Sequence, residues 1–240
     1  MERVPFSERD ALAKMAELSN AADSRTSRSI LESRFREPLI AAVRQKELNV
    51  NKSSVKTVYI LVGPKGSGKT FIGNALEDRL GILFIRVEKL LIEYVEKNGL
   101  QSNKLPRDGF DIEEQAIARA LALRHAVITE ATGSSIYFSD FIDRLNERYN
   151  VTLVRVKCPP ETCLERVARR ATQDQFAVDD KTLRRINNKA ASAEFDWSFE
   201  IDNSQNQSVA NVVACFADGI RHKSAQQTNA RDGEYAARDR

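Results

Sequence analysis

One short segment combines glycines, a lysine and a hydroxyl residue in a spacing that suits phosphate chemistry. Residues 63–70 read GPKGSGKT, which matches the pattern G-x-x-x-x-G-K-[ST] of a phosphate-binding loop. Glycine readily adopts the dihedrals that turn successive backbone N–H groups around an anion, and the helix expected next adds its positive N-terminus. Lys69 can reach the β- and γ-phosphates of a nucleotide, and Thr70 can ligate Mg²⁺. We predict nucleotide binding by Gly63, Lys65, Gly66, Ser67, Gly68, Lys69 and Thr70.

Two glutamates follow predicted strands and are candidates for metal binding and catalysis. Glu130 comes directly after the apolar run 126–129, and Glu88 comes directly after the run 82–87. Sites form outside the carboxyl ends of parallel strands, so both acids should face the crevice that holds the phosphates. We predict that Glu130 binds the metal together with Thr70 and that Glu88, or Glu130 in its place, orients an acceptor hydroxyl. The alternatives are a surface glutamate at a strand end and a solvated residue in the first turn of a helix.

Arginines flank a polar segment that we expect to form a closing lid. These arginines are Arg166, Arg169, Arg170, Arg184 and Arg185. Phosphoryl transfer requires mobile cations that neutralise the transferring group, and a helix–loop–helix with arginines at both bases can supply them. We therefore predict a lid over 166–185, with Arg166 and Arg170 in catalysis and Arg169 in nucleotide binding. The alternative is a solvated basic helix face.

The elements that position these residues alternate regularly between about residues 55 and 220. Short apolar runs predict strands over 57–62, 82–87, 126–129, 151–157 and 197–201. Amphipathic stretches predict helices over 71–80, 89–97, 112–124, 137–149, 159–171, a helix capped by Asp179, and 209–220. Such alternation predicts an α/β fold of three layers, α/β/α, with a five-stranded parallel sheet, the helical lid and an N-terminal helical extension.

The segments on either side of this core differ from it in composition. Residues 1–54 are polar and helix-prone, and we expect a helical, partly flexible extension that docks a protein partner. Residues 221–240 carry almost no large apolar side chain, which predicts a disordered tail.

Composition narrows the classes of protein to which the chain can belong. The 37 basic and 34 acidic residues give a net charge of +3, which does not favour nucleic-acid binding. The apolar runs are too short to span a membrane, and the charged N-terminus lacks a signal sequence, so we expect a cytoplasmic location. Two histidines and three cysteines without a Cys-x-x-Cys pair leave carboxylates, lysine, arginine and a metal as the catalytic groups, with the cysteines as free thiols.

Beyond the loop, the region from about residue 56 to 220 resembles the small P-loop kinases, a group that includes shikimate kinases and nucleoside monophosphate kinases. The resemblance is strongest to shikimate kinases. The matching residues are GPKGSGKT, Ile72-Gly73-Asn74-Ala75-Leu76, Leu80-Gly81-Ile82-Leu83-Phe84-Ile85, Phe110-x-x-x-Glu114 and Thr132-Gly133. The resemblance implies a five-stranded parallel sheet with a lid. It also implies transfer of the γ-phosphate of ATP, with Mg²⁺, to the hydroxyl of a small molecule.

The acceptor motifs of shikimate kinases are altered in this chain. Arg86-Val87-Glu88 stands where the family has Asp-x-Asp, and Gly133-Ser134-Ser135 stands where it has three glycines. Asp111 replaces the arginine that clamps the substrate carboxylate, and the lid motif Arg-Pro-Leu-Leu is missing. An aspartate cannot hold a carboxylate, so we predict a neutral or cationic acceptor, with Arg86 available to pair with Asp111.

Three functions therefore remain open from the sequence. The first is an ATP-dependent kinase of a small molecule with an altered acceptor site. The second is a nucleotide-binding regulatory or interaction module with weak or no transferase activity, favoured by the altered acceptor motifs and the extra N-terminal residues. The third, a nucleotide or polynucleotide kinase, is favoured only by the arginines.

Overall fold

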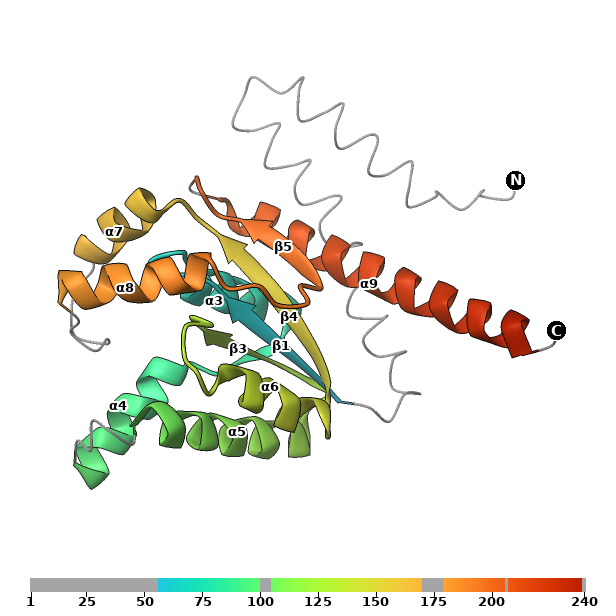
Figure 1. Ribbon diagram of the computed structural model, residues 1–240, viewed down its shortest axis with the longest axis horizontal. Coiled ribbons are helices and arrows are strands. Elements are labelled where there is room, and N and C mark those ends of the chain that lie inside the picture. The colour runs from blue at the N-terminus through green and yellow to red at the C-terminus, as the bar shows by residue number, and fades with distance from the viewer. Residues whose placement is uncertain (1–55, 100–104, 170–178, 206, 239–240) are drawn as a thin grey trace, which may run out of the picture. The chain divides into compact units, whose positions relative to one another are not determined.

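The chain divides into two compact units, Met1–Ser53 and Ser54–Arg240. The computed structural model describes residues 56–238 except 100–104, 170–178 and 206, so everything described lies in the second unit. The predicted extension over 1–54 and most of the predicted lid loop lie outside the described residues. Helices and strands are labelled as in Figure 1.

Within the described residues, five parallel strands form one sheet in the order β2-β3-β1-β4-β5 (Figure 1). They are β1 (Thr57–Val62), β2 (Leu83–Phe84), β3 (Ala126–Ala131), β4 (Asn150–Lys157) and β5 (Phe199–Asp202). β1 is central, and its residues from Val58 onward are buried, which explains the continuous apolar run. The chain leaves β1 toward β2 and β3 on one side and continues to β4 and β5 on the other. This reversal opens a crevice at the carboxyl ends of the strands.

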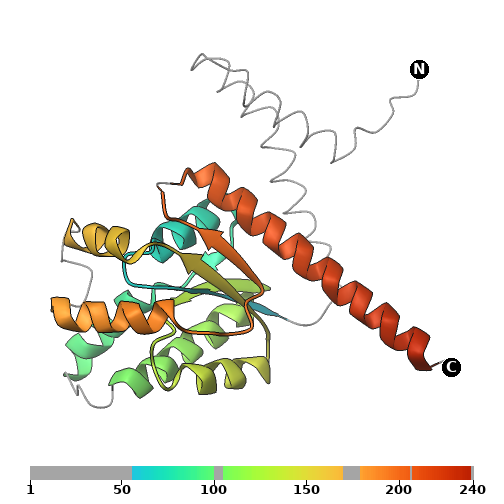
Figure 2. The ribbon, with the colours of Figure 1, turned by 45° about the horizontal axis from the view of Figure 1, so that its top comes forward.

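Helices cover both faces of the sheet, so the predicted three-layer α/β/α fold is confirmed (Figure 2). They are α3 (Lys69–Leu80), α4 (Val87–Asn98), α5 (Leu105–Leu123), α6 (Phe138–Asn146), α7 (Pro160–Ala168), α8 (Asp180–Ala191) and α9 (Val209–Arg238). α3 and α9 pack together on one face, and α5 and α6 pack on the other. Asp179 caps α8 as predicted, because its carboxylate accepts a hydrogen bond from the Thr182 backbone N–H at 2.9 Å.

Each face of the sheet has its own apolar core. On the α5–α6 face, Ile60 of β1 packs with Phe138 and Phe141 of α6 in one buried cluster. On the α3–α9 face, the ring of Tyr59 meets Phe216 of α9 edge-on, with ring centroids 5.1 Å apart. Neighbouring residues of β1 therefore point to opposite cores, which fixes the strand between the two helical layers.

Several element boundaries differ from those predicted, and the differences matter for the site. β2 holds only two residues, because Arg86 turns out of the strand and α4 begins at Val87. β3 continues to Ala131, beyond the predicted end of the strand, because Ala131 pairs with Val62 and accepts a hydrogen bond from the Gly63 N–H at 3.2 Å. α5 also begins earlier than predicted, at Leu105. Glu130 therefore lies inside a strand rather than after it.

The prediction of a disordered tail over 221–240 is wrong for the residues up to Arg238, where α9 continues past the edge of the sheet (Figure 1). The first half of α9 is anchored by packing, and the later residues are rich in Ala and Arg, which favour helix without a core. Lys223 adds an anchor, since its ammonium donates to the Val151 carbonyl at 3.1 Å and to Thr152 Oγ1 at 2.7 Å.

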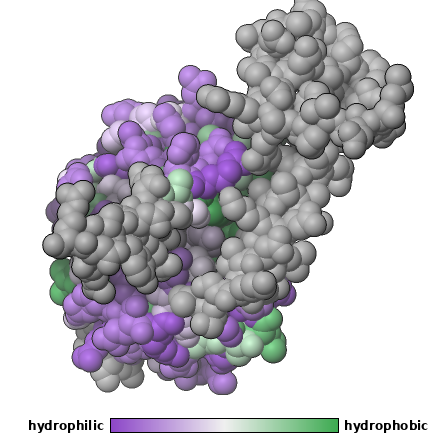
Figure 3. Space-filling model, turned by 90° about the vertical axis from the view of Figure 1, so that its right-hand side faces the viewer, coloured by the Kyte–Doolittle hydropathy of each residue, from purple (hydrophilic) through white to green (hydrophobic). Residues whose placement is uncertain are grey.

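The described helices and the visible surface were compared with what a membrane crossing requires. None of the described helices, α9 included, combines the length and apolar character that a membrane crossing requires. The part of the described surface seen in Figure 3 is mainly hydrophilic, with small apolar areas between the charged ones.

Candidate active site

The loop between β1 and α3 is closely packed, and its glycines are required by that packing. Gly66 and Gly68 have φ of +90° and +92°, in the left-handed region that favours glycine. A Cβ on Gly66 would lie 2.2 Å from the Cys163 carbonyl oxygen of α7, and one on Gly68 would lie 2.1 Å from Asn203 Nδ2. The loop is therefore seated between α7 and the end of β5, and neither glycine can be replaced without moving a neighbour.

Two side chains inside the loop fit a phosphate group. The Lys69 ammonium, almost fully buried, donates to the carbonyl oxygens of Gly63 at 2.8 Å and Pro64 at 2.9 Å. Ser67 Oγ is buried and has no hydrogen-bond partner within the described part of the chain. A buried hydroxyl without a partner is costly, so the loop gains a satisfied donor when a phosphate oxygen enters it. The cradle thus fits the anion that its motif predicts.

The two residues predicted to bind a metal lie together. Thr70 Oγ1 donates to the Glu130 carboxylate, with distances of 3.2 Å to Oε1 and 3.0 Å to Oε2. The contact follows from the sheet, because β3 lies beside β1 and carries Glu130 to the start of α3. Mg²⁺ prefers oxygen ligands and uses few from the protein, so a hydroxyl and a carboxylate at the phosphate loop suit it. The described residues contain no larger cluster of metal-binding side chains.

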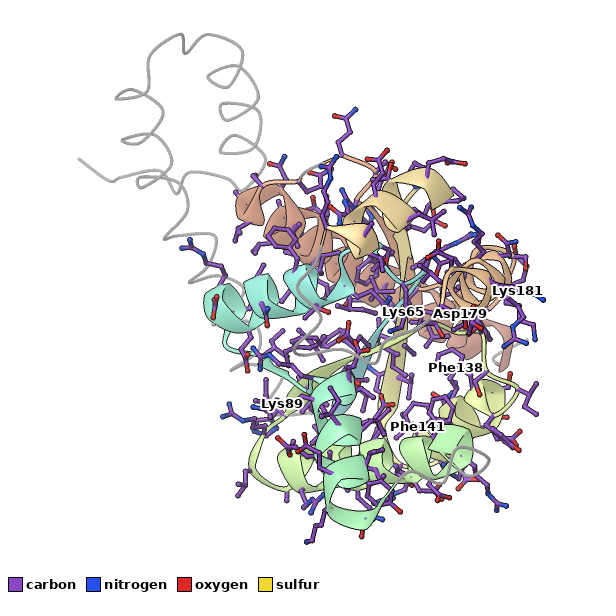
Figure 4. All side chains as sticks on the ribbon, turned by 90° about the vertical axis from the view of Figure 1, so that its left-hand side faces the viewer. Lys65, Lys89, Phe138, Phe141, Asp179 and Lys181 are labelled. Atoms are coloured by element: carbon purple, nitrogen blue, oxygen red, sulfur yellow. The ribbon has the colours of Figure 1, made fainter. Side chains whose placement is uncertain are left out.

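Glu88, in the first turn of α4, faces the phosphate loop as the sequence predicts. Its Oε1 lies 2.9 Å from the Lys65 ammonium, and both side chains are about one-quarter exposed, at 28% and 24%. Figure 4 views the edge at which the strands end, with Lys65 near its middle. Lys89 of α4 lies on one side of it, and Asp179 and Lys181 at the start of α8 lie on the other. In this view Lys65 lies between α4 and the start of α8.

Arg166 has a different environment from the one expected for a lid residue. Its Nη1 donates to the Asn203 carbonyl at 2.9 Å and lies 3.3 Å from Cys158 Sγ. Asn203 in turn donates from Nδ2 to the Ser67 carbonyl at 2.7 Å. The structure thus connects Arg166 to the phosphate loop through Asn203.

Arg169, the other predicted lid arginine of α7 that the structure describes, pairs within its own helix. Arg169 ends α7 with its side chain 82% exposed, 3.8 Å from Glu165. Arg170 lies outside the described residues. The three cysteines are free thiols, as predicted, but only Cys163 is buried, whereas burial of all three was expected.

Comparisons with known proteins agree with this geometry. The sequence profile of the family described as "AAA domain" matches residues 58–192, which include the phosphate loop, Glu88, Glu130 and α8. The chain belongs to this family. The AAA domain is also similar to shikimate kinase 2 of Salmonella dublin and of Salmonella paratyphi C, with 32% identity over 105 residues in each case. That match covers 43% of this chain and 56% of each relative, so the chain spans about half the length of the curated relatives it matches.

Solved structures share the fold at low sequence identity. A shikimate kinase from Aquifex aeolicus has a TM-score of 0.51 and 16% identity, covering 70% of this chain and 98% of that one. A sugar kinase from Janibacter has a TM-score of 0.51 and 18% identity, covering 69% and 95%. The tunicamycin resistance protein of Deinococcus radiodurans has a TM-score of 0.52 and 19% identity, covering 68% and 95%. The AAA domain of this chain thus has the fold of the small P-loop kinases.

The sequence did not reveal a buried acid near Glu130. Glu113 of α5 is 2% exposed, and its Oε1 accepts a hydrogen bond from Thr129 Oγ1 at 2.6 Å. Burial raises the pKa of Glu113 to about 8, and the charge of nearby Glu130 adds to this effect. Glu113 is therefore mainly protonated at neutral pH.

Two buried asparagines that hold the AAA domain's phosphate loop were also missed. Asn187 of α8 accepts from the Lys65 N–H at 2.8 Å and donates to the Lys65 carbonyl at 3.0 Å. Asn203 follows β5 and holds Ser67 as described above. The available signal for Asn187 was its place on the apolar face of the predicted helix, four residues after Leu183. Asn203 gave no comparable signal, because it lies in a polar run.

The predicted pairing of Arg86 with Asp111 is wrong. Arg86 Nη2 instead lies 2.9 Å from Glu77 Oε2 of α3. Asp111, 54% exposed, pairs with Arg144 of α6 at 3.1 Å, and Glu114 pairs with the same arginine at 2.8 Å. These ion pairs join α5 to α6, because the residues after Phe110 turn their charges toward the neighbouring helix.

Proposed function

We propose that the chain is a phosphotransferase that uses ATP and Mg²⁺ to phosphorylate a hydroxyl group of a small molecule. The observation that carries the proposal is the contact between Thr70 and Glu130 at 3.0 Å, directly beside the phosphate loop. A loop alone supports nucleotide binding, whereas a loop with a metal pair at the entrance of a crevice supports phosphoryl transfer. Membership of the AAA domain family and the kinase fold support the same conclusion.

The side chains of the loop have separate tasks in this proposal. ATP with Mg²⁺ would supply the phosphoryl group and the charge that offsets its negative oxygens. The Lys69 ammonium gives up its hydrogen bonds to the carbonyl oxygens of Gly63 and Pro64 and donates to phosphate oxygens instead. The Ser67 hydroxyl also donates a hydrogen bond to a phosphate oxygen. Thr70 and Glu130 would hold the metal through their oxygens.

Glu88 has the task of receiving the acceptor. Its carboxylate orients the acceptor hydroxyl and takes its proton as the new phosphate ester forms. Arg169 and Arg170 neutralise charge when the lid closes, whereas Arg166 positions Asn203 and hence the loop.

Charge in the crevice favours a neutral or cationic acceptor. Glu88 and Glu130 border it, and the basic residues Lys65 and Arg86 are each paired with a glutamate. Asp111 takes no part in this preference, because it pairs with Arg144 outside the crevice. A carboxylate substrate would meet the like charge of Glu88 and Glu130, which disfavours its binding.

A nucleotide-binding module with little transfer remains the second candidate. The Lys65–Glu88 ion pair favours it, because a carboxylate that contacts a lysine is not positioned to receive an acceptor hydroxyl. A protein partner for residues 1–54 and a cytoplasmic location remain predictions from the sequence.

The experiment that separates these candidates is ATP turnover across polyols, nucleosides, cyclitols and shikimate. A kinase phosphorylates at least one neutral or cationic acceptor and loses this activity in Lys69→Met, while the mutant keeps its melting temperature. Tight ATP binding with no transfer to any acceptor supports the module instead. Efficient phosphorylation of shikimate contradicts the proposed acceptor preference.

A further inference from the structure

Lys65 joins three elements that surround the crevice. Its backbone N–H and carbonyl are both bonded to the Asn187 side chain of α8, at 2.8 and 3.0 Å. Its ammonium lies 2.9 Å from Glu88 of α4. The backbone N–H of Lys65 thus points to α8 rather than to a phosphate. The part of this residue that remains able to act on a ligand is the ammonium group.

The ammonium crosses the place where phosphoryl transfer would occur. The phosphate loop follows β1, Glu88 follows β2, and β3 lies between these two strands in the sheet. β3 carries Glu130, the partner of Thr70. A side chain that reaches from the loop to Glu88 therefore spans the end of β3, between the metal pair and the acceptor side. A γ-phosphate bound there and the Glu88 carboxylate would compete for the same cation.

We propose that Lys65 exchanges Glu88 for the γ-phosphate, so that a bound triphosphate frees Glu88 to receive the acceptor hydroxyl. This inference rests on the proposed function. Both partners of the pair are partly exposed, and such ion pairs contribute little to stability. A phosphate offers Lys65 more negative charge than one carboxylate, so the exchange is favourable. The Asn187 bonds keep the backbone of Lys65 in place, and only the flexible side chain has to move.

The exchange gives Glu88 its role at the moment of transfer. The bond between the acceptor oxygen and the γ-phosphorus forms, and the bond from that phosphorus to the β–γ bridging oxygen breaks. ADP leaves with the electron pair of the broken bond, and the hydroxyl proton passes to the Glu88 carboxylate. Before the triphosphate binds, Lys65 occupies that carboxylate. Hydroxyl compounds therefore find Glu88 engaged by Lys65 in the absence of ATP.

The test compares two nucleotides that differ only at the γ-position. Isothermal titration calorimetry with Mg²⁺ measures the affinities of AMP-PNP and ADP for the full chain and its variants. Lys65→Met should weaken the binding of AMP-PNP about tenfold and leave the affinity for ADP unchanged. Glu88→Gln should strengthen the binding of AMP-PNP about threefold, because Lys65 no longer has to leave a carboxylate. It should also leave the affinity for ADP unchanged. The double variant should behave like Lys65→Met alone.

Matched controls lie on the same helix as Glu88. Lys89→Met and Glu96→Gln remove one exposed charge each from α4 and should leave the ratio of AMP-PNP to ADP affinity at the wild-type value. The proposal is overturned if Glu88→Gln weakens the binding of AMP-PNP. It is also overturned if Lys65→Met and Glu88→Gln each change the affinities for the two nucleotides equally. Wild-type protein that binds neither nucleotide overturns the proposed function itself, whereas binding of both without these effects overturns only the role of Lys65.

Discussion

Glu113 makes the stability of the protein depend on pH in a direction opposite to that of most carboxylates. Its pKa in the folded state is about 8, compared with an ordinary value of 4.5. Between these values the unfolded chain has lost the proton that the folded chain keeps, so stability falls as pH rises from about 4.5 to about 8. Below this range both states are protonated, and above it both are ionised.

Glu113→Gln should therefore remove this pH dependence. The amide oxygen still accepts from Thr129, and the variant cannot ionise, so its free energy of unfolding should exceed that of the wild type at pH 8. The wild-type slope attributable to one proton is up to about 1.4 kcal/mol per pH unit. Urea denaturation at pH 5.5 and 8 measures it. Glu114→Gln is the control, and equal slopes for wild type and Glu113→Gln contradict the assignment.

Ser67→Ala should separate stability from nucleotide binding. The hydroxyl is buried without a partner, so its removal should raise the free energy of unfolding by about 1 kcal/mol. Loss of a donor to phosphate should weaken ATP about fivefold. Thermal denaturation and calorimetry measure the two effects on one sample. A stability loss together with unchanged ATP affinity would show that Ser67 serves the fold alone.

The sequence predicted the pairing of Thr70 with Glu130 because each position follows from a strand and its neighbour in the sheet. Glu113 could not be found in the same way. It lies in the polar run Glu113-Glu114-Gln115, where the residue that turns inward depends on the start of α5. That start was predicted at Ile112, although the helix begins at Leu105.

At the scale of elements, α8 supports the phosphate loop through one side chain. Asn187→Ala should lower the free energy of unfolding by about 1–3 kcal/mol, because it leaves the N–H and carbonyl of Lys65 without their partner. It should also weaken both ADP and AMP-PNP, since the loop loses its fixed position. Chemical denaturation and nucleotide titration measure these losses. Asn188→Ala, exposed and next in the sequence, should match wild type, and equal effects of the two substitutions would argue against a role of Asn187.

Most elements were predictable in kind, whereas their ends were set by partners elsewhere in the fold. β3 extends beyond its apolar run because β1 continues to pair with it through Ala131. β2 stops early because Arg86 turns toward Glu77 of α3. Neither neighbour can be assigned before the strand order is known, so local periodicity alone gives the wrong ends.

At the scale of the whole chain, the first unit should be separable from the nucleotide site. Removal of residues 1–50 leaves β1 and every described element intact, since the second unit begins at Ser54. We expect the shortened chain to keep its ATP affinity within about twofold, because a compact unit with its own core can fold by itself. Calorimetry and thermal melting compare it with the full chain. Insolubility, or a large drop in melting temperature, would place residues 1–50 within the folded core.

The bond from Asn203 to the Ser67 carbonyl joins residues 136 positions apart. Contacts of such long range form late, because the chain must first close the loop between them. The phosphate loop should therefore reach its final conformation only after β5 has joined the sheet. The single tryptophan, Trp197, stands just before β5, and its fluorescence can follow that step during refolding. A fluorescent nucleotide added to the same reaction should bind no earlier than the tryptophan signal changes. A ribosome-bound chain that has not yet exposed Asn203 should remain unable to hold ATP.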